Sequence, residues 1–275
     1  MGKISDALER RRKETALKSE KHPLAVPERI VEERSPKIIS KPLLDFTGFS
    51  HKLVVVTAPD SMDAENFKVL RGQILFPQKG EPPRCIMVTS AFPGEGKTYV
   101  AANLAVSIAL GINEHVLMVD CDLRRPSLHK MLGYKRAEGL REYLRGERDL
   151  PELLVKTKID KLSLLMAGKP AHNPSELLAS SAMREFIREV KNRYDDRYII
   201  LDATPSQVTA EANVLAHNVD GVVFVVMNQK APRETVRRSI ENLGKNKIIG
   251  IVFNGYSKSY KAYDMPGTLT AAGRC

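Results

Sequence analysis

A glycine-bearing segment is the part of this chain best suited to chemistry. Residues 86–98 have the sequence IMVTSAFPGEGKT, which matches the spacing G-x-x-x-x-G-K-[ST] with Ala91 at the first glycine position. In such a loop, successive backbone N–H groups can point inward and bind phosphate oxygens, here around Gly94, Glu95 and Gly96. An ordinary corner between a strand and a helix is the alternative. The order of strand, loop and helix favours a phosphate-binding loop.

The residues after the loop extend this prediction to a nucleotide and a metal. Lys97 would reach the β- and γ-phosphates of a nucleotide, and the Thr98 hydroxyl would take a coordination position of Mg²⁺. The N-terminus of the helix that starts here adds its partial positive charge. We also expect nucleotide contacts from Tyr99, the next residue of the helix, and from Asn254, at the end of the last predicted strand.

Carboxylates follow two predicted strands, His115–Asp120 and Arg197–Asp202. The first strand runs into Asp120 and Asp122, and Asp202 ends the second. A nucleotide at the loop needs hard oxygen ligands for its Mg²⁺. A single Asp after a strand is commonly a helix cap, but carboxylates after both strands beside a phosphate loop favour a metal site.

The elements that must position these residues alternate between strands and helices. Continuous apolar runs separated by amphipathic segments predict a mostly parallel sheet covered by helices on both faces. Ligands of such sheets bind beyond the carboxyl ends of the strands, where the loop and the aspartates lie. Strands are expected at 53–57, 86–89, 115–120, 162–168, 197–202, 221–227 and 247–254, and helices at 60–76, 97–110, 139–145, 183–193 and 232–243.

Composition narrows the class of protein. The chain has 275 residues, of which 43% are hydrophobic and 28% charged, as expected of one α/β domain with tails. No apolar run is long enough to cross a bilayer and the start does not resemble a signal peptide, so we expect a soluble chain. Cys85, Cys121 and Cys275 have no paired spacing, which favours a reducing cytoplasm over a disulfide or zinc framework. The net charge of +10 suits an anionic membrane, a nucleic acid or a nucleotide, without choosing among them.

Four motifs in order carry a family resemblance: SAFPGEGKT, VLMVDCDLRRP, NPSELL at Asn173–Leu178, and IILDATP. From about Leu53 to Asn254 the chain resembles the bacterial tyrosine kinases of polysaccharide export, relatives of the ParA/MinD ATPases. The resemblance implies a P-loop NTPase fold with ATP and Mg²⁺ as cofactors. It also implies an ATP-dependent protein-tyrosine autokinase that regulates synthesis or export of an extracellular polysaccharide.

The resemblance also implies a role for each matching residue. Lys97 and Thr98 would lie at the phosphates and the metal, Asp122 would be a metal ligand, and Asp202 would be the Walker B carboxylate. Asp120 would take the proton from a tyrosine hydroxyl. The residues themselves leave open whether Arg124 and Arg125 bind phosphate, join a subunit interface or face solvent.

Assembly is expected through a helix before the loop. The family carries Glu-x-x-Arg-x-x-Arg there, and this chain has Glu65, Lys68 and Arg71. Lysine lacks the planar fork of arginine, so contacts to carboxylates through this face differ from the family pattern. The resemblance implies a homo-oligomer, a separate membrane-embedded activator chain and a cognate tyrosine phosphatase as partners, and no nucleic acid. The chain would then lie in the cytoplasm, at the inner face of the membrane through its partner.

The ends of the chain flank the predicted kinase domain at 51–255. Residues 1–50 are expected to be an extension and linker, which starts with either an amphipathic helix or a solvated charged segment. Residues 256–275 are expected to be a tail that carries the phosphoacceptors Tyr256, Tyr260 and Tyr263. Tyr256 follows the last strand too closely to travel far, so Tyr260 and Tyr263 are the expected main acceptors, phosphorylated between subunits.

Two other functions share these motifs. A ParA/MinD-like ATPase that positions DNA or septation proteins would carry a lysine where this chain has Phe92. A non-catalytic nucleotide sensor would not need the lysine, threonine and aspartates that are present here. The sequence therefore favours the kinase.

Overall fold

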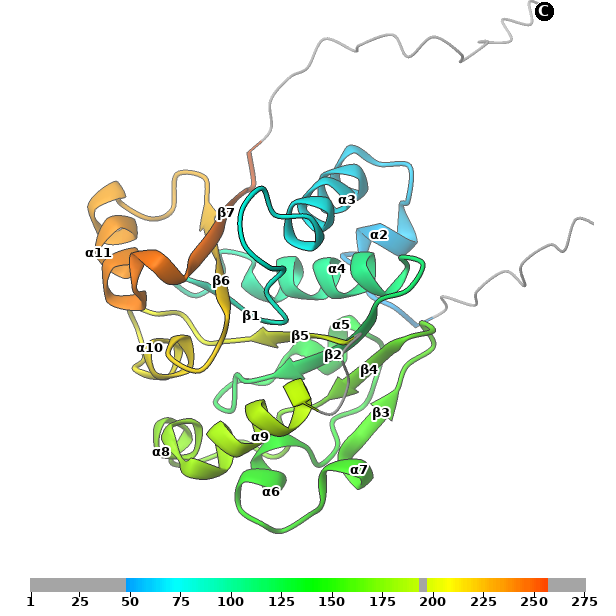
Figure 1. The fold of residues 1–275 in the computed structure, drawn as a ribbon, viewed down its shortest axis with the longest axis vertical. Helices are drawn as coiled ribbons and strands as arrows, with labels where there is room; N and C mark the ends of the chain where they lie inside the picture. Colours follow the sequence, from blue (N-terminus) through cyan, green and yellow to red (C-terminus); the bar gives the residue numbers. More distant parts are fainter. Residues whose placement is uncertain (1–47, 193–196, 257–275) are drawn as a thin grey trace, which may run out of the picture. The chain divides into compact units, whose positions relative to one another are not determined.

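A seven-stranded sheet forms the centre of the described structure (Figure 1). The computed structural model describes residues 48–192 and 197–256, which lie in the second of two units into which the chain divides after Leu43. The strand order is β3-β4-β2-β5-β1-β6-β7, and neighbours are parallel except β3 with β4. The predicted mostly parallel sheet is confirmed. Its strands are β1 (Cys85–Ser90), β2 (His115–Asp120), β3 (Leu154–Lys156), β4 (Leu162–Leu165), β5 (Arg197–Asp202), β6 (Gly221–Met227) and β7 (Ile248–Asn254).

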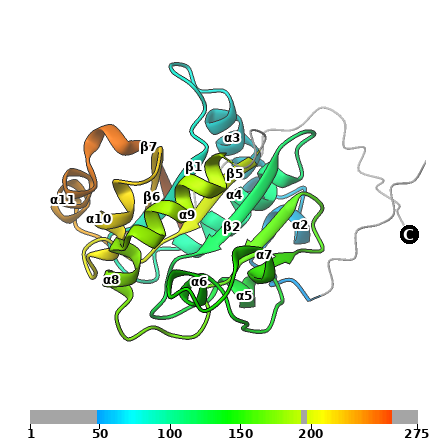
Figure 2. The ribbon, with the colours of Figure 1, turned by 60° about the horizontal axis from the view of Figure 1, so that its bottom comes forward.

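Helices cover both faces of the sheet, as Figures 1 and 2 show. The buried side chains divide into two clusters, one on each face. The first cluster joins the sheet to α2 (Val54–Thr57), α3 (Met62–Leu75), α4 (Lys97–Ala109) and α5 (Leu128–Met131). The second joins it to α6 (Leu140–Leu144), α7 (Leu150–Leu153), α8 (Pro174–Ala179), α9 (Ser181–Asn192), α10 (Glu211–Ala216) and α11 (Arg233–Leu243). A short 3-10 helix, η1 (Lys245–Lys247), leads into β7.

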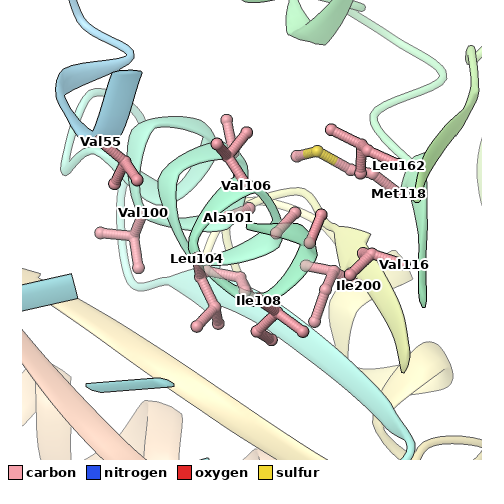
Figure 3. Packing of buried hydrophobic residues seen from close by; sticks show 14 of the residues in the cluster. Val55, Val100, Ala101, Leu104, Val106, Ile108, Val116, Met118, Leu162 and Ile200 are labelled. Carbon is pink, nitrogen blue, oxygen red and sulfur yellow. The ribbon is translucent and has the colours of Figure 1, made fainter. Parts of the chain in front are cut away.

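Helix α4 lies in the middle of the first cluster. Every residue of this helix except Thr98 and Tyr99 is buried. A helix that is apolar on all sides belongs in a protein interior. Figure 3 shows Val55 of α2 on one side of α4, and Met118, Leu162 and Ile200 of the sheet on another. Because α4 is fixed on all sides, the loop at its N-terminus is held in a fixed position.

One predicted strand is wrong. Residues 53–57 contain three consecutive valines and were expected to be extended, but Val54–Thr57 form helix α2. Asn103 of α4 determines the difference: its Oδ1 accepts the Val55 N–H at 3.2 Å, and its Nδ2 donates to the Lys52 carbonyl at 2.9 Å. Four or five apolar residues have too little periodicity to distinguish the two structures.

The remaining predicted strands and helices are confirmed, with boundaries that differ by a few residues. The short elements β3, α5, α7, α8 and α10 were not predicted from the sequence. No helix within residues 48–192 and 197–256 combines the length and the apolar character that a bilayer crossing requires.

Candidate functional site

The loop between β1 and α4 turns through two glycines. Gly94 has φ of +78°, and Gly96, the N-cap of α4, has φ of +95°. Side chains are strained in this region of backbone space. A Cβ on Gly94 would lie 2.6 Å from Nζ of Lys230, and one on Gly96 would collide with the Asn254 side chain. The glycines thus permit both the turn and the close packing that bring the loop to the N-terminus of a long helix, where anions bind.

Glu95 braces this loop from the inside. Its buried carboxylate accepts the backbone N–H of Phe92 at 2.6 Å and that of Met227 at 3.3 Å. Its carbonyl oxygen accepts Nδ2 of Asn254 at 2.9 Å. The loop is therefore tied to the ends of β6 and β7. The side chain of Glu95 is structural, so any contact of Glu95 with a nucleotide is made through its backbone.

Lys97 lies among carboxylates. Its Nζ is 3.4 Å from Oδ2 of Asp122, 3.7 Å from Oδ1 of Asp202 and 3.4 Å from Oγ1 of Thr98. Burial lowers the pKa of Lys97, but the charges of Asp202 and Asp122 raise it more, and the pKa ends above its ordinary value. Lys97 is therefore a stable cation, and in this state its ammonium group is directed at the carboxylates.

Asp120 and Asp202 are opposite one another on the adjacent strands β2 and β5. The oxygens of Asp120 accept the backbone N–H groups of Asp122 at 3.1 Å and Leu128 at 3.2 Å. Burial, followed by the charge of Asp202, raises the pKa of Asp120 to about 8. Burial also raises the pKa of Asp202, although Lys97 opposes this. Burial and the mutual repulsion of the two carboxyls therefore both disfavour full ionisation of this pair.

The oxygens at this position fit a magnesium ion. Neither oxygen of Asp202 accepts a well-formed hydrogen bond from the described residues, and the side chain is fully buried. In the structure the ammonium group of Lys97, 3.7 Å from Oδ1, is the cation that faces this carboxylate, and both oxygens keep lone pairs that a metal ion could use. No three His, Cys, Asp or Glu side chains of the described ranges converge as a preformed metal cage. Mg²⁺ would therefore bind Thr98, Asp122 and Asp202 together with phosphate oxygens and water.

A cavity of about 1190 Å³ lies against the loop. Ligand cavities commonly measure about 300–1,000 Å³, so this one has room for a nucleotide and part of an acceptor. Asp120 and Asp202 do not line it, because they lie buried behind Lys97 and Asp122. The predicted residues that line it are Gly94, Gly96, Lys97, Thr98, Tyr99, Asp122 and Asn254.

Cationic side chains from other segments also line this cavity. Arg124 and Arg125, whose roles the residues left open, both lie on it. Lys52 and Lys130 lie on it too, and sequence reasoning missed them because nothing in their neighbourhood resembles a ligand motif. The four side chains make the cavity suitable for an anionic ligand.

The leading segment, residues 48–52, forms one wall of the cavity through Ser50, His51 and Lys52. The N–H of Ser50 donates to the carbonyl of Met131 at 3.1 Å. Gly133 lies so close to the Gly48 carbonyl that a Cβ there would collide with it. This wall is therefore anchored at both ends, by residues after β2 and by Asn103 of α4.

The predicted interface residues lie on α3. Lys68 pairs with Glu65 of the same helix at 2.9 Å, and both are exposed. Arg71 instead donates from Nη1 to the Ser107 carbonyl at 2.8 Å and so joins α3 to α4. The assembly role of the three residues stays a prediction.

Of the predicted phosphoacceptors, Tyr256 is described and Tyr260 and Tyr263 lie outside the described residues. Tyr256 is 57% exposed, and its ring centroid is 5.8 Å from that of Phe253 on β7. It therefore stays beside the last strand, as the short spacing predicts.

A family model described as "ParA: NUBPL iron-transfer P-loop NTPase" matches residues 82–262. The two cysteines of the described residues lie within this range and are buried, and burial raises the pKa of Cys85 to about 12 and that of Cys121 well above its ordinary value, so both are thiols at neutral pH.

The chain is also similar over most of its length to individual proteins. The chain is 32% identical over 219 residues to the tyrosine-protein kinase YwqD of Bacillus subtilis, with 78% of this chain and 91% of YwqD covered. It is 34% identical to the succinoglycan biosynthesis transport protein ExoP of Rhizobium meliloti, over 73% of this chain but only 26% of ExoP. The kinase domain of the Escherichia coli tyrosine kinase ETK superposes with a TM-score of 0.68 at 27% identity, covering 76% of this chain and 84% of that domain. The chain therefore belongs to the ParA family of P-loop NTPases and, within it, to the bacterial tyrosine kinases.

Proposed function

We propose that this chain is an ATP-dependent protein-tyrosine autokinase that regulates the synthesis or export of an extracellular polysaccharide. The observation that carries the proposal is the meeting of Lys97, Asp122 and Asp202 behind a phosphate loop that lines a large cavity. Similarity to YwqD supports the kinase activity, and similarity to ExoP, named for succinoglycan biosynthesis transport, supports the link to a polysaccharide.

The reaction assigns a task to each side chain. The tyrosine oxygen attacks the γ-phosphorus, the bond from this phosphorus to the β,γ-bridging oxygen breaks, and ADP leaves. Asp120 takes the phenolic proton, and Lys97 neutralises charge on the transferring group. Bound Mg²⁺ would supply Lewis-acid stabilisation of the phosphate oxygens. Because Asp120 is buried and its pKa is raised to about 8, it can take this proton only in its ionised form, which a bound Mg²⁺ nearby would favour. The transfer also requires that Lys97 and Asp122 move when the nucleotide binds.

Phe92 argues against the positioning ATPase. That class carries a lysine at this place in the loop, whereas Phe92 packs against the second hydrophobic cluster. An aromatic side chain so placed supplies no cation to a partner's nucleotide.

The proposal extends to partners. Subunits would assemble through the face of Glu65, Lys68 and Arg71, and a separate membrane-embedded chain would activate the kinase at the inner face of the membrane. A cognate phosphatase would reverse the modification.

The direct test is incubation of the purified chain with Mg-ATP, followed by mass spectrometry of the tail. Phosphotyrosine is expected on the wild type and absent from Lys97→Met. Because Lys97 also neutralises buried carboxylates, Thr98→Ala provides a second inactive variant that keeps the cation. Undiminished phosphotyrosine in folded samples of both variants would refute the assignment of the activity to this site.

Transfer between subunits has its own test. A Lys97→Met subunit is mixed with an active subunit whose Tyr256, Tyr260 and Tyr263 are replaced by Phe. We expect phosphate on the inactive subunit, mainly at Tyr260 and Tyr263. No phosphate there would exclude transfer in trans, and phosphate mainly at Tyr256 would contradict the reach argument.

A further inference from the structure

Three polar side chains from three segments meet beside the nucleotide cavity. Arg124 follows β2, Ser175 lies in α8, and Glu211 starts α10. Nε of Arg124 donates to Oε1 of Glu211 at 2.8 Å, and Oγ of Ser175 donates to the same oxygen at 3.0 Å. Two sequence motifs, DLRRP and NPSELL, thus meet on one carboxylate. The nucleotide chemistry derived above uses neither Ser175 nor Glu211.

Glu211 is the fixed member of this group. It is fully buried, and its second oxygen, Oε2, accepts no hydrogen bond from the described residues. A buried carboxylate is costly unless a cation neutralises it, and the described ion pair of Glu211 is with Arg124. The burial of Glu211 therefore restrains the guanidinium of Arg124.

Arg124 itself reaches the ligand space. Its side chain is 49% exposed and lines the cavity. A guanidinium has five N–H donors, and the bond to Glu211 uses the one at Nε. The donors at Nη1 and Nη2 can bind an anion in two-pronged fashion. The backbone before Arg124 is also held, because the Ala171 N–H donates to the Leu123 carbonyl at 3.0 Å.

We propose that Glu211 is a positioning residue that holds Arg124 so that its guanidinium binds the γ-phosphoryl group of the nucleotide. This rests on the proposed nucleotide site. The loop amides serve the phosphates nearest the helix N-terminus, and Lys97 marks the β,γ end. Lys97 contacts Asp122, and Arg124 is two residues further along the same loop. Arg124, Lys97 and Asp122 line the same cavity, so an arginine held here faces the end of the site where the terminal phosphoryl group is expected.

The test compares the affinities of the full chain for ADP and for a non-hydrolysable ATP analogue, both with Mg²⁺, by calorimetry. Arg124→Ala should weaken binding of the analogue by about tenfold to a hundredfold, the range for a charge-assisted hydrogen-bonded contact, and barely change ADP affinity. Glu211→Ala should weaken binding of the analogue to a similar degree. The double variant should lose little more than either single one, because both changes remove the same contact.

Glu211→Gln separates charge from hydrogen bonding. An amide oxygen can accept both existing bonds at Oε1, while the negative charge is lost, so we expect a smaller loss of analogue affinity. This variant and Arg124→Ala keep the test valid if Glu211→Ala does not fold. Arg141→Ala is the matched control: Arg141 pairs with the buried Glu142 at 2.8 Å, and it does not line the cavity. It should leave both affinities unchanged.

The alternatives give different results. Equal losses for ADP and the analogue would reduce Arg124 and Glu211 to structural residues and overturn the proposal. Unchanged analogue affinity with a raised KM for an acceptor peptide would mean that Arg124 binds the acceptor, which also overturns it. If the wild type binds neither nucleotide, the proposed function fails as well. If the wild type phosphorylates its tail but Arg124→Ala leaves analogue affinity unchanged, only the present proposal fails.

Discussion

Replacing Lys97 with Met in the protein free of metal and nucleotide removes the cation that faces Asp122 and Asp202. Methionine is similar in length and apolar, so the change tests charge more than packing. The two carboxylates that remain have little contact with solvent, and Asp202 is fully buried. The folded variant must therefore hold negative charge that nothing compensates, or bind a proton.

The size of the effect follows from these distances. Nζ of Lys97 lies 3.4 Å from the Asp122 carboxylate and 3.7 Å from that of Asp202. At an effective dielectric constant of about 20, each of these attractions is worth between about 4 and 5 kcal/mol. The variant no longer has to bury an ammonium group, and this gain offsets part of the lost attraction. The remaining destabilisation has a ceiling, because the buried carboxylate can take up a proton instead of staying charged. Keeping a carboxyl protonated at pH 7 requires its pKa to rise by about 3 units, which costs about 4 kcal/mol. We therefore expect a loss of roughly 3–4 kcal/mol, within the range for a buried pair that loses one partner.

The loss of stability should depend on pH in one direction. The carboxyl pKa is raised in the folded variant, so the loss is largest at high pH and falls by about 1.4 kcal/mol per unit as pH drops toward the ordinary aspartate pKa. Urea unfolding between pH 5 and 8 in a chelating buffer measures it. Asp202→Asn in the Lys97→Met background should restore about half of the loss, and Lys68→Met, in an exposed pair, is the control. A pH-independent loss, or no restoration by the second change, would refute the reasoning.

Three further predictions concern the aspartate pair Asp120 and Asp122, then Asp220, and the two buried cysteines. Asp122→Asn should weaken Mg-ATP binding because it removes a charged oxygen ligand, whereas Asp120→Asn should reduce the phosphorylation rate more than the affinity; equal losses of affinity would show that the roles are divided wrongly. Asp220 accepts the Cys85 N–H at 2.9 Å, and although burial raises its pKa, a lysine ammonium and backbone N–H groups leave this pKa below its ordinary value. Its contribution to stability is therefore present above the ordinary aspartate pKa and lost as pH falls, so Asp220→Asn should cost about 1–2 kcal/mol at pH 7 and progressively less in acid, as urea titrations at several pH values will show. The buried thiols of Cys85 and Cys121, with raised pKa values, should resist iodoacetamide at pH 8 until urea unfolds the chain; mass spectrometry would reveal any native labelling that contradicts this.

The strands of the sheet interior could be predicted because burial on both faces imposes a continuous apolar run. His115–Asp120 and Gly221–Met227 are such runs, and each is a strand with the predicted bounds. The same logic located Asp120 and Asp202 at the carboxyl edge, since parallel strands end together. The structure adds that these two face each other, a matter of register that no local pattern specifies.

The features that sequence reasoning missed depend on contacts between distant segments. Val54–Thr57 is helical because Asn103, about 50 residues away, supplies its hydrogen bonds. The pairing of Arg124 with Glu211 spans 87 residues and follows from the packing of α8 and α10 below the loop. β3 has three residues and a partly exposed pattern, too short for a period-two signal. Propensity and spacing act locally, and these contacts do not.

The leading segment has a mechanical consequence. A pulling force applied to the chain at Gly48 would act first on a short set of hydrogen bonds, from Ser50 to Met131 and from Asn103 to Lys52. Those bonds hold a wall of the cavity that also contains Lys97 and Thr98. Tension along the backbone at this point would therefore act directly on a wall of the cavity.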